Sequence, residues 1–385
     1  MADDWKNGGF GLYIHWPFCA AKCPYCDFNS HVADRIDHDR WKRAYLAEID
    51  RLAGQLSGRC LSTVYFGGGT PSLMAPDTVA AVLDKLRLCW PMANDPEVTL
   101  EANPGSVEAG RFAGYSEAGV SRLSLGVQAL NDADLHRLGR IHTAAEARQA
   151  FDIAKKYFSR VSFDLIYARQ YQSLVAWRAE LCEALSMAVD HLSLYHLTIE
   201  PGTAFGARHA RGRLPGLPDE ARGSDLFEAT QDICARAGLP AYEISSHARP
   251  GAESRHNLIY WRYGDYAGIG PGAHGRLTLS GQRHATESWS LPDRWLTAVE
   301  AGTGDKIVMP LSPRDQGDEY VMMGLRIDEG VDLRRYQAIS DGQIPVDRLN
   351  HLEEIGMIAR DGPLLRATAR GRQVLNAVIG TLLRG

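Results

Sequence analysis

The chain has 385 residues, of which 45% are hydrophobic, so it can bury a sizeable core and is too apolar for a disordered protein. The net charge is −5 and no run of lysines and arginines occurs, which argues against a protein whose affinity comes mainly from nucleic-acid phosphates. The start, MADDWKNGG, lacks the features of a signal peptide, and no apolar run approaches the length of a membrane span, so we expect a cytoplasmic protein.

The first two-thirds of the chain alternates between short β-like runs and longer helical runs. Six strand–helix repeats of this kind indicate a parallel sheet with right-handed crossovers. The pattern fits both a barrel-like sheet and an open, doubly wound sheet. The expected strands are 10–16, 62–68, 97–103, 122–128, 160–167 and 191–199, and the expected helices are 38–56, 76–89, 106–118, 143–157, 173–188 and 219–237.

The pattern changes after residue 200. Residues 200–220 are rich in Gly, Pro and Arg and indicate a long loop, and residues 256–275 are aromatic and glycine-rich. From about residue 312 the sequence predicts helices and a short strand–turn–strand with its turn at Gly362-Pro363, which is typical of a winged-helix-like cap used for DNA binding or for packing. We therefore expect a core domain over 1–240, a connecting segment over 241–311 and a C-terminal domain over 312–385.

Polar and glycine residues occur at or near the carboxyl ends of the expected strands, where parallel α/β folds collect their chemistry. Each alone has a structural explanation, such as a helix cap, a turn or a loop ion pair. Together they outline one site. The set comprises Cys19, Cys23, Cys26, the GGGTP stretch at 67–71, Glu101, Asn103, Gln128, Asp164, Tyr195 and His196.

Three of the seven cysteines form a C-x3-C-x2-C cluster on one short loop. A reducing compartment and the odd number of cysteines disfavour disulfides. Structural zinc takes four ligands, so a zinc site would need His15 or His31 as the fourth. A [4Fe–4S] cluster is normally held by four thiolates, and three would leave one iron open to a substrate or cofactor. The other four cysteines are expected to be small buried hydrophobes.

The sequence CAAKCPYC resembles the cysteine motif of the radical S-adenosylmethionine (SAM) superfamily. The resemblance implies a partial (β/α)6, TIM-like barrel and an open iron that chelates the amino and carboxylate groups of SAM. An electron from the cluster would then split the sulfonium and yield a 5′-deoxyadenosyl radical, with the protein orienting the cofactor. In the superfamily the stretch equivalent to GGGTP contacts the SAM amino group.

A narrower resemblance is to the oxygen-independent coproporphyrinogen III oxidase family, through LYIHWPFC, YFGGGTPSL, EANPGS, SLGVQALND, GRIHT and FDLIY. It implies that Glu101 accepts from ribose hydroxyls, that Arg140 pairs with a carboxylate and that Asp164 pairs with an ammonium. The alternatives are a surface arginine and a loop-fixing aspartate. The implied first SAM site contains Tyr13, Gly68, Glu101 and Tyr195, and the second, found in the dehydrogenase branch, contains Tyr25, Gly69, Thr70, Gln128, Arg140 and Asp164.

Three departures from that family bear on function. The dehydrogenase branch has a fourth cysteine where this chain has Phe28, and it carries an N-terminal extension where this chain has only a short segment before residue 10. The family usually continues FDLIY with Gly-Leu-Pro, whereas this chain has Ala168-Arg169-Gln170, which weakens the second SAM assignment. The first two departures favour the sister branch, the HemW-type heme chaperones.

That branch carries an H-N-x-x-Y-W motif, present here as HNLIYW from His256 to Trp261. An imidazole can ligate heme iron and aromatic rings can stack on a porphyrin, so the resemblance implies a heme site at His256. The alternative is that these rings belong to the core of the second domain.

Three functions follow as hypotheses. The first is a heme carrier, with a [4Fe–4S] cluster, SAM and heme as cofactors and no coproporphyrinogen III dehydrogenase activity. The second is the oxidative decarboxylation of coproporphyrinogen III, and the third is an RNA-modifying radical enzyme, which the acidic balance disfavours. The implied partners are heme-accepting respiratory proteins and an electron donor such as flavodoxin or ferredoxin. The protein is also expected to associate transiently with a membrane and to bind no nucleic acid. We expect a monomer or a cluster-dependent dimer.

Overall fold

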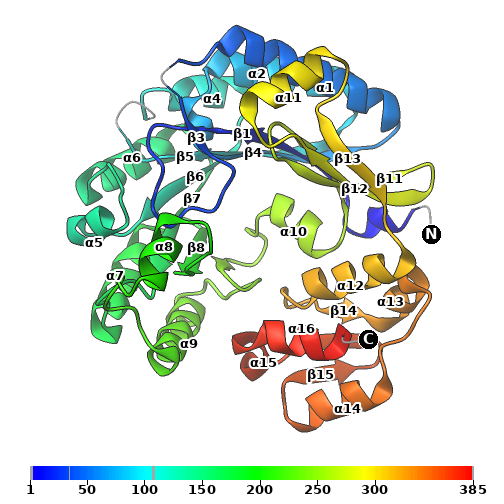
Figure 1. Ribbon diagram of the computed structural model, residues 1–385. Coiled ribbons are helices and arrows are strands. Elements are labelled where there is room, and N and C mark those ends of the chain that lie inside the picture. Colours follow the sequence, from blue (N-terminus) through cyan, green and yellow to red (C-terminus); the bar gives the residue numbers. More distant parts are fainter. Residues whose placement is uncertain (1–2, 34, 106–108, 384–385) are drawn as a thin grey trace.

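The computed structural model describes residues 3–33, 35–105 and 109–383, and its main element is one curved sheet (Figure 1). The strands of that sheet are β1 (Phe10–Trp16), β4 (Leu61–Gly68), β5 (Met92–Ala102), β6 (Arg122–Gln128), β7 (Arg160–Tyr167), β8 (His191–His196), β9 (Ser246–Ala248), β10 (Asp265–Ile269), β11 (His274–Leu279), β12 (Gln282–Ser288) and β13 (Asp305–Pro310). A separate parallel pair, β2 (Phe18–Cys19) and β3 (His31–Val32), brackets the cysteine loop.

The strand order of the sheet is β13-β12-β11-β10-β1-β4-β5-β6-β7-β8-β9. Among the described residues, seven neighbouring strands from β10 to β8 run parallel, and β9 and β11–β13 run antiparallel at the two ends. The two end strands do not pair with each other, so the sheet is an open barrel. The partial barrel with alternating strands and helices is therefore confirmed.

The helices that follow the parallel strands cover the outer face of the sheet (Figure 1). Helix α1 shows why: Trp41, Tyr45, Ile49 and Leu52 lie on one face and are buried in the main core. The helices of this part are α1 (His38–Gln55), α2 (Pro76–Cys89), α4 (Phe112–Ala118), α5 (Asp132–Arg137), α6 (Ala144–Tyr157), α7 (Leu174–Met187), α8 (Ala204–Ala210), α9 (Glu220–Arg236), α10 (Arg255–Trp261) and α11 (Pro292–Glu300), with short 3-10 turns η1 (Asp4–Asn7) and η2 (Pro71–Leu73).

Three sequence expectations differ from the structure in detail. The segment 200–220, expected as a loop, contains α8, because the Thr203 side chain caps its first turn and Phe205 is buried. Strand β8 ends at His196, three residues earlier than expected, and β5 begins at Met92 rather than at residue 97. The start of the helix expected at 106–118 lies partly outside the described residues.

The segment 241–311 was expected to be a connection, but it contributes β9 to β13 to the main sheet. Strand β10 is a further parallel strand that pairs with β1, from Phe10 opposite Asp265 to Ile14 opposite Ile269. The segment thus extends the sheet at both ends, with β9 beside β8 and β10 to β13 beyond β1.

The C-terminal part is mostly helical, as expected for a winged-helix-like cap. It has its own hydrophobic core, and a small antiparallel sheet in the order β14-β16-β15 forms the wing, whose turn lies at Gly362 with φ +57°. Its elements are α12 (Pro313–Gly324), β14 (Val331–Asp332), α13 (Leu333–Ser340), α14 (Val346–Glu354), β15 (Ile358–Asp361), β16 (Leu364–Ala367), α15 (Ala369–Gln373) and α16 (Leu375–Leu383).

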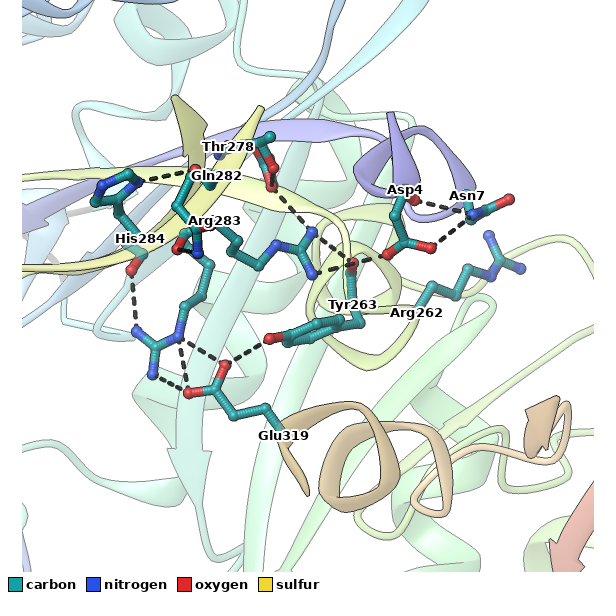
Figure 2. Close-up of polar contacts among 12 residues, drawn as sticks. Asp4, Asn7, Arg262, Tyr263, Thr278, Gln282, Arg283, His284 and Glu319 are labelled. Atoms are coloured by element: carbon teal, nitrogen blue, oxygen red, sulfur yellow. Dashed lines mark hydrogen bonds and ion pairs between the residues drawn. The ribbon is translucent and has the colours of Figure 1, made fainter. Parts of the chain in front are cut away.

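A network of ion pairs fastens this cap to the barrel (Figure 2). Glu319 of α12 accepts hydrogen bonds from the Arg276 guanidinium and, at 2.9 Å, from the Tyr263 hydroxyl. On the other side, Arg335 of α13 donates two hydrogen bonds of 2.9 Å to Asp4 near the N-terminus. Both ends of the chain are therefore tied to the same part of the sheet. In the described part of the chain no helix is both long and apolar enough to span a bilayer.

Candidate functional site

The cysteine loop lies at the carboxyl end of β1, and the parallel β2–β3 pair closes it. The Asn29 side chain anchors the loop by donating hydrogen bonds to the carbonyl oxygens of Pro271 (2.9 Å) and Ser290 (2.8 Å), which lie beyond β10 and β12. Cys19, Cys23 and Cys26 are free thiols of intermediate exposure. The loop is thus held from both sides while its sulfur atoms stay accessible.

Two polar side chains from neighbouring strand ends point at these sulfurs. The Thr70 hydroxyl donates to Cys19 Sγ at 3.3 Å, and Arg140 Nη1 donates to Cys23 Sγ at 3.4 Å. Burial raises the pKa of the Cys19 and Cys26 thiols, so the unligated loop holds them protonated and iron ligation would replace the protons. Within the described ranges no three His, Cys, Asp or Glu side chains are grouped closely enough to hold a single metal ion, whereas the thiolates of a [4Fe–4S] cluster each bind a different iron.

The GGGTP stretch at the end of β4 packs directly beneath the cysteine loop. The amides of Gly69 and Thr70 donate to the carbonyl oxygens of Trp16 (2.7 Å) and Phe18 (2.8 Å). A Cβ atom at Gly69 would lie 2.7 Å from the Phe18 oxygen, and Gly68 has φ +115°, so glycine is required at both positions. These glycines therefore allow the cysteine loop to pack closely against the carboxyl end of β4.

Tyr13, Tyr65 and Glu101 form a connected row inside the barrel mouth. The two tyrosine rings stack with centroids 6.2 Å apart, the Tyr65 hydroxyl donates to Glu101 Oε1 at 2.7 Å, and the Gly68 amide donates to Glu101 Oε2 at 3.3 Å. Burial raises the pKa of Glu101 to about 7. The ionised carboxylate accepts hydrogen bonds from ligand hydroxyls more strongly than the protonated acid does, so its binding of such a ligand should strengthen as the pH rises through neutrality.

Arg140 links the cysteine loop to the next two strand ends. Its Nη2 donates to Asn103 Oδ1 at 2.6 Å and to the Gly126 carbonyl at 2.8 Å, while its Nε is buried and has no hydrogen-bond partner among the described residues. Gln128 ends β6 with φ +71°, a conformation that non-glycine residues rarely adopt. A buried cation with an unused donor is what a carboxylate ligand would require.

Asp164 and Tyr195 lie on the next two strands, whereas Tyr25 lies apart from them. Ser124 donates to Asp164 Oδ1 at 3.3 Å, and burial raises the Asp164 pKa to about 6. Tyr195 is 43% exposed at the end of β8. Tyr25 packs on Phe205 of α8, with ring centroids 6.3 Å apart, and its hydroxyl lies beside Cys23 and Arg140. Tyr25 therefore lines the cysteine loop next to Arg140.

His256, in the first turn of α10, lies inside the barrel beside the row of Tyr13, Tyr65 and Glu101. Its Nδ1 is 2.7 Å from Thr63 Oγ1 and its Nε2 is 2.6 Å from the Tyr260 hydroxyl. The ring stacks on Tyr65 at 5.1 Å and is 1% exposed, and burial lowers its pKa to about 3. In this arrangement both ring nitrogens have protein partners and the ring is buried, whereas a heme ligand needs a free ring nitrogen.

Two residues have roles that the SAM assignments from the sequence did not include. Asn103 belongs to the expected strand-end set, and it bridges the site, because its Nδ2 donates to Thr70 Oγ1 at 3.2 Å while its Oδ1 accepts from Arg140. Arg169, from the departure after β7, is 3% exposed and donates to the Gln128 carbonyl at 3.3 Å, so it helps to hold the strained end of β6. Neither role has a local sequence signal, because the partners lie on distant segments.

Residues 13–171 match the radical SAM superfamily, and residues 311–374 match the HemN C-terminal domain. The chain is 45% identical over 270 residues to the heme chaperone HemW of Escherichia coli, covering 70% of both proteins. It is 38% identical over 385 residues to the mitochondrial radical S-adenosyl methionine domain-containing protein 1 of Bos taurus, covering 97% of this chain and 87% of that protein. The chain belongs to the HemW family of radical SAM proteins.

The fold of this HemW-family chain is similar to that of coproporphyrinogen III oxidase (HemN) from Escherichia coli, with a TM-score of 0.82 over 98% of this chain and 92% of that one. The sequence identity is 20%, so this likeness concerns the fold alone. It confirms the partial barrel and the C-terminal cap together.

Membership of the radical SAM superfamily implies a [4Fe–4S] cluster and SAM, and the residues present fit both groups. The cysteine loop offers three accessible sulfurs backed by Thr70 and Arg140, and the unpartnered Arg140 Nε offers a donor beside them. When bound, the cluster supplies an electron for reductive cleavage of SAM. The residues of this HemW-family chain would orient the two groups: the three cysteines would hold the cluster, Arg140 a carboxylate, and Glu101 a hydroxyl pair.

Proposed function

We propose that this protein is a heme chaperone, which binds heme and passes it to acceptor proteins such as respiratory enzymes. The observation that carries the proposal is Phe28, which is 60% exposed two residues after Cys26. The coproporphyrinogen III dehydrogenase branch has a fourth cysteine at this position, and a phenyl ring can neither ligate nor donate. The relatives named as heme chaperones support the same assignment.

The proposal includes the cofactor sites expected from the sequence. Cys19, Cys23 and Cys26 would hold the cluster, and the residues at the strand ends, from Tyr13 to Tyr195, would hold SAM. A second SAM molecule is the weaker part of the assignment, because Ala168-Arg169-Gln170 follows β7 where the resemblance expects Gly-Leu-Pro. The electron donor, the monomer or cluster-dependent dimer, and the cytoplasmic location stay predictions.

The alternative function is dehydrogenation of coproporphyrinogen III. The buried carboxyl groups of Glu101 and Asp164 and the cysteine loop would serve that chemistry equally well. The two functions separate experimentally, because one requires tight binding of an iron porphyrin and the other requires conversion of a propionate side chain to a vinyl group.

The experiment is an anaerobic heme titration of the cluster-loaded protein, followed by absorbance, beside an assay with coproporphyrinogen III, SAM and a reductant. We expect saturation near one heme per chain and no protoporphyrinogen IX. Product formation without specific heme binding would overturn the chaperone assignment and leave Phe28 as the feature to explain.

A further inference from the structure

A groove of about 680 Å³ lies along the outer side of the cysteine loop. We call it the loop groove. Its walls come from three segments: the cysteine loop, the end of α5 and the start of α8. The lining residues are Lys22, Cys23, Pro24, Cys26, His136, Arg137, Gly139, Gly202, Thr203, Ala204 and Arg208. Its size is within the range of small-molecule sites in proteins, and its concave shape differs from the flat surfaces on which proteins dock.

The loop groove is separate from the strand-end site. None of the residues assigned to SAM lines it, and it shares only Cys23 and Cys26 with the candidate cluster site. Residues 136–140 lie between the loop groove and the strand-end site. Arg140 donates hydrogen bonds to Asn103 and Gly126 at the strand ends, whereas His136 and Arg137 line the groove. A ligand in the groove would therefore lie beside the cluster without displacing SAM.

The lining of the loop groove is cationic and contains no carboxylate. Arg137 pairs with Asp134 at 2.7 Å, but Asp134 also accepts from Arg169, so one negative charge is shared by two guanidinium groups. Arg208 lies over the Phe205 ring at 5.9 Å and has no ion pair in the described ranges, and Lys22 Nζ donates only to the Ser30 carbonyl among those residues. The lining thus carries net positive charge, from Arg208 of α8 and Lys22 of the loop, with Arg137 of α5 partly compensated by Asp134.

Two further features narrow the class of ligand. His136 is an exposed histidine on the groove wall, and its ring nitrogens have no hydrogen-bond partner in the part of the chain that the structure describes. Apart from the two cysteines and the cations, the wall is made of the small residues Pro24, Gly139, Gly202, Thr203 and Ala204. Arg137 also lies near the exposed ring of Tyr171, at 5.7 Å, which places an aromatic surface beside it.

We propose that the loop groove is the heme site of this protein, with His136 as axial ligand and Arg137 and Arg208 binding the two propionates. A porphyrin with an open iron position and two carboxylates matches a groove that carries a free imidazole and guanidinium groups from α5 and α8. His256, by contrast, has both ring nitrogens occupied in the core. The inference rests on the proposed heme-chaperone function and assigns its cargo site.

The test is an anaerobic heme titration of cluster-loaded wild type, His136→Ala, Arg137→Ala and Arg208→Ala. We expect each arginine variant to weaken heme binding about tenfold and to leave affinity for the iron complex of protoporphyrin IX dimethyl ester unchanged, because that probe lacks charged propionates. His136→Ala should lose the nitrogen-ligated heme spectrum and regain it with added imidazole. His209→Ala and Arg211→Ala, exposed substitutions on or next to α8 outside the groove, are the matched controls and should behave as wild type.

The possible failures are distinguishable. If the wild type binds no heme, the proposed function fails and this inference fails with it. If the wild type binds heme and all three groove variants bind it equally well, the function stands and the loop groove is not the site. If the arginine variants keep heme affinity but are reduced more slowly by an acidic protein reductant, the groove is a docking surface for the electron donor, which also overturns the assignment.

Discussion

Lowering the pH should destabilise this protein through the buried imidazole of His256, and His256→Gln should remove that part of the effect. Burial lowers the pKa of His256 to about 3, against 6.5 for an unperturbed histidine. Between these pH values the unfolded chain binds a proton here and the folded chain does not, so the free energy of unfolding falls as the pH falls. The stabilisation is therefore complete above about pH 6.5 and is lost below it.

The size of the effect follows from the proton balance. At about pH 5.5, one unit below the pKa of an unfolded histidine, this single site lowers the free energy of unfolding by about 1.4 kcal/mol, or about tenfold in the unfolding constant. Burial also lowers the pKa values of His15, His142 and His247 to about 4 each, so the wild-type dependence exceeds one proton. Only the difference between wild type and variant is assigned to His256.

The assay compares urea midpoints of the cluster-loaded protein at about pH 7.5 and 5.5 by far-ultraviolet circular dichroism. His256→Gln is less stable at both pH values, because a glutamine cannot keep both the Thr63 and the Tyr260 contact, but its pH dependence should be smaller by about 1.4 kcal/mol. His209→Gln on exposed α8 is the control and should keep the wild-type dependence. Parallel curves for wild type and His256→Gln would refute the reasoning, since they would mean that the imidazole is exposed in solution, as a ready heme ligand would be.

Three further predictions concern the cluster, SAM and the cap. The reconstituted wild type should hold about four irons and sulfides per chain, and Cys23→Ser should lose them. Normal iron and sulfide content in the variant would contradict the cluster assignment. Because the pKa of Glu101 is about 7, the SAM affinity of the wild type should rise as the pH increases through 7. The affinity of Glu101→Gln should be weak and independent of pH over the same range. If calorimetric titrations show the same pH dependence for wild type and variant, Glu101 is not part of the SAM site. Glu319→Gln should destabilise the docking of the cap by about 1–3 kcal/mol, because Arg276 loses its charge partner, and limited proteolysis should then release the cap faster; an unchanged rate would mean that other contacts hold it.

The parallel strands, most helix ends and the cysteine loop could be predicted because their signals are local. Alternating apolar runs, helix caps and three cysteines within eight positions can each be seen in one short window. The strand-end site could also be predicted, since parallel strands bring residues such as Glu101 and Asp164 to one edge whatever their distance in sequence. The family resemblance then indicated that these residues bind SAM.

The unexpected features are those made by distant segments. Strand β10 is a five-residue run whose pairing partner is at the other end of the chain, so no local pattern distinguishes it from a loop. The HNLIYW motif drew attention to His256 as a ligand, but its environment depends on Thr63 and Tyr65 of β4. The loop groove is similarly assembled from three separate segments, none of which is unusual alone.

The pairing of β10 with β1 has a consequence for folding on the ribosome. Strand β1 and the cysteine loop are made first, but the sheet position beside Phe10 is filled only after Asp265 has been synthesised. Contacts between segments so far apart form late, because long loops must close before they are stabilised. During most of synthesis the cysteine loop therefore lies at an unfinished sheet edge, and we expect iron–sulfur assembly proteins to reach it more readily in the nascent chain than in the completed fold.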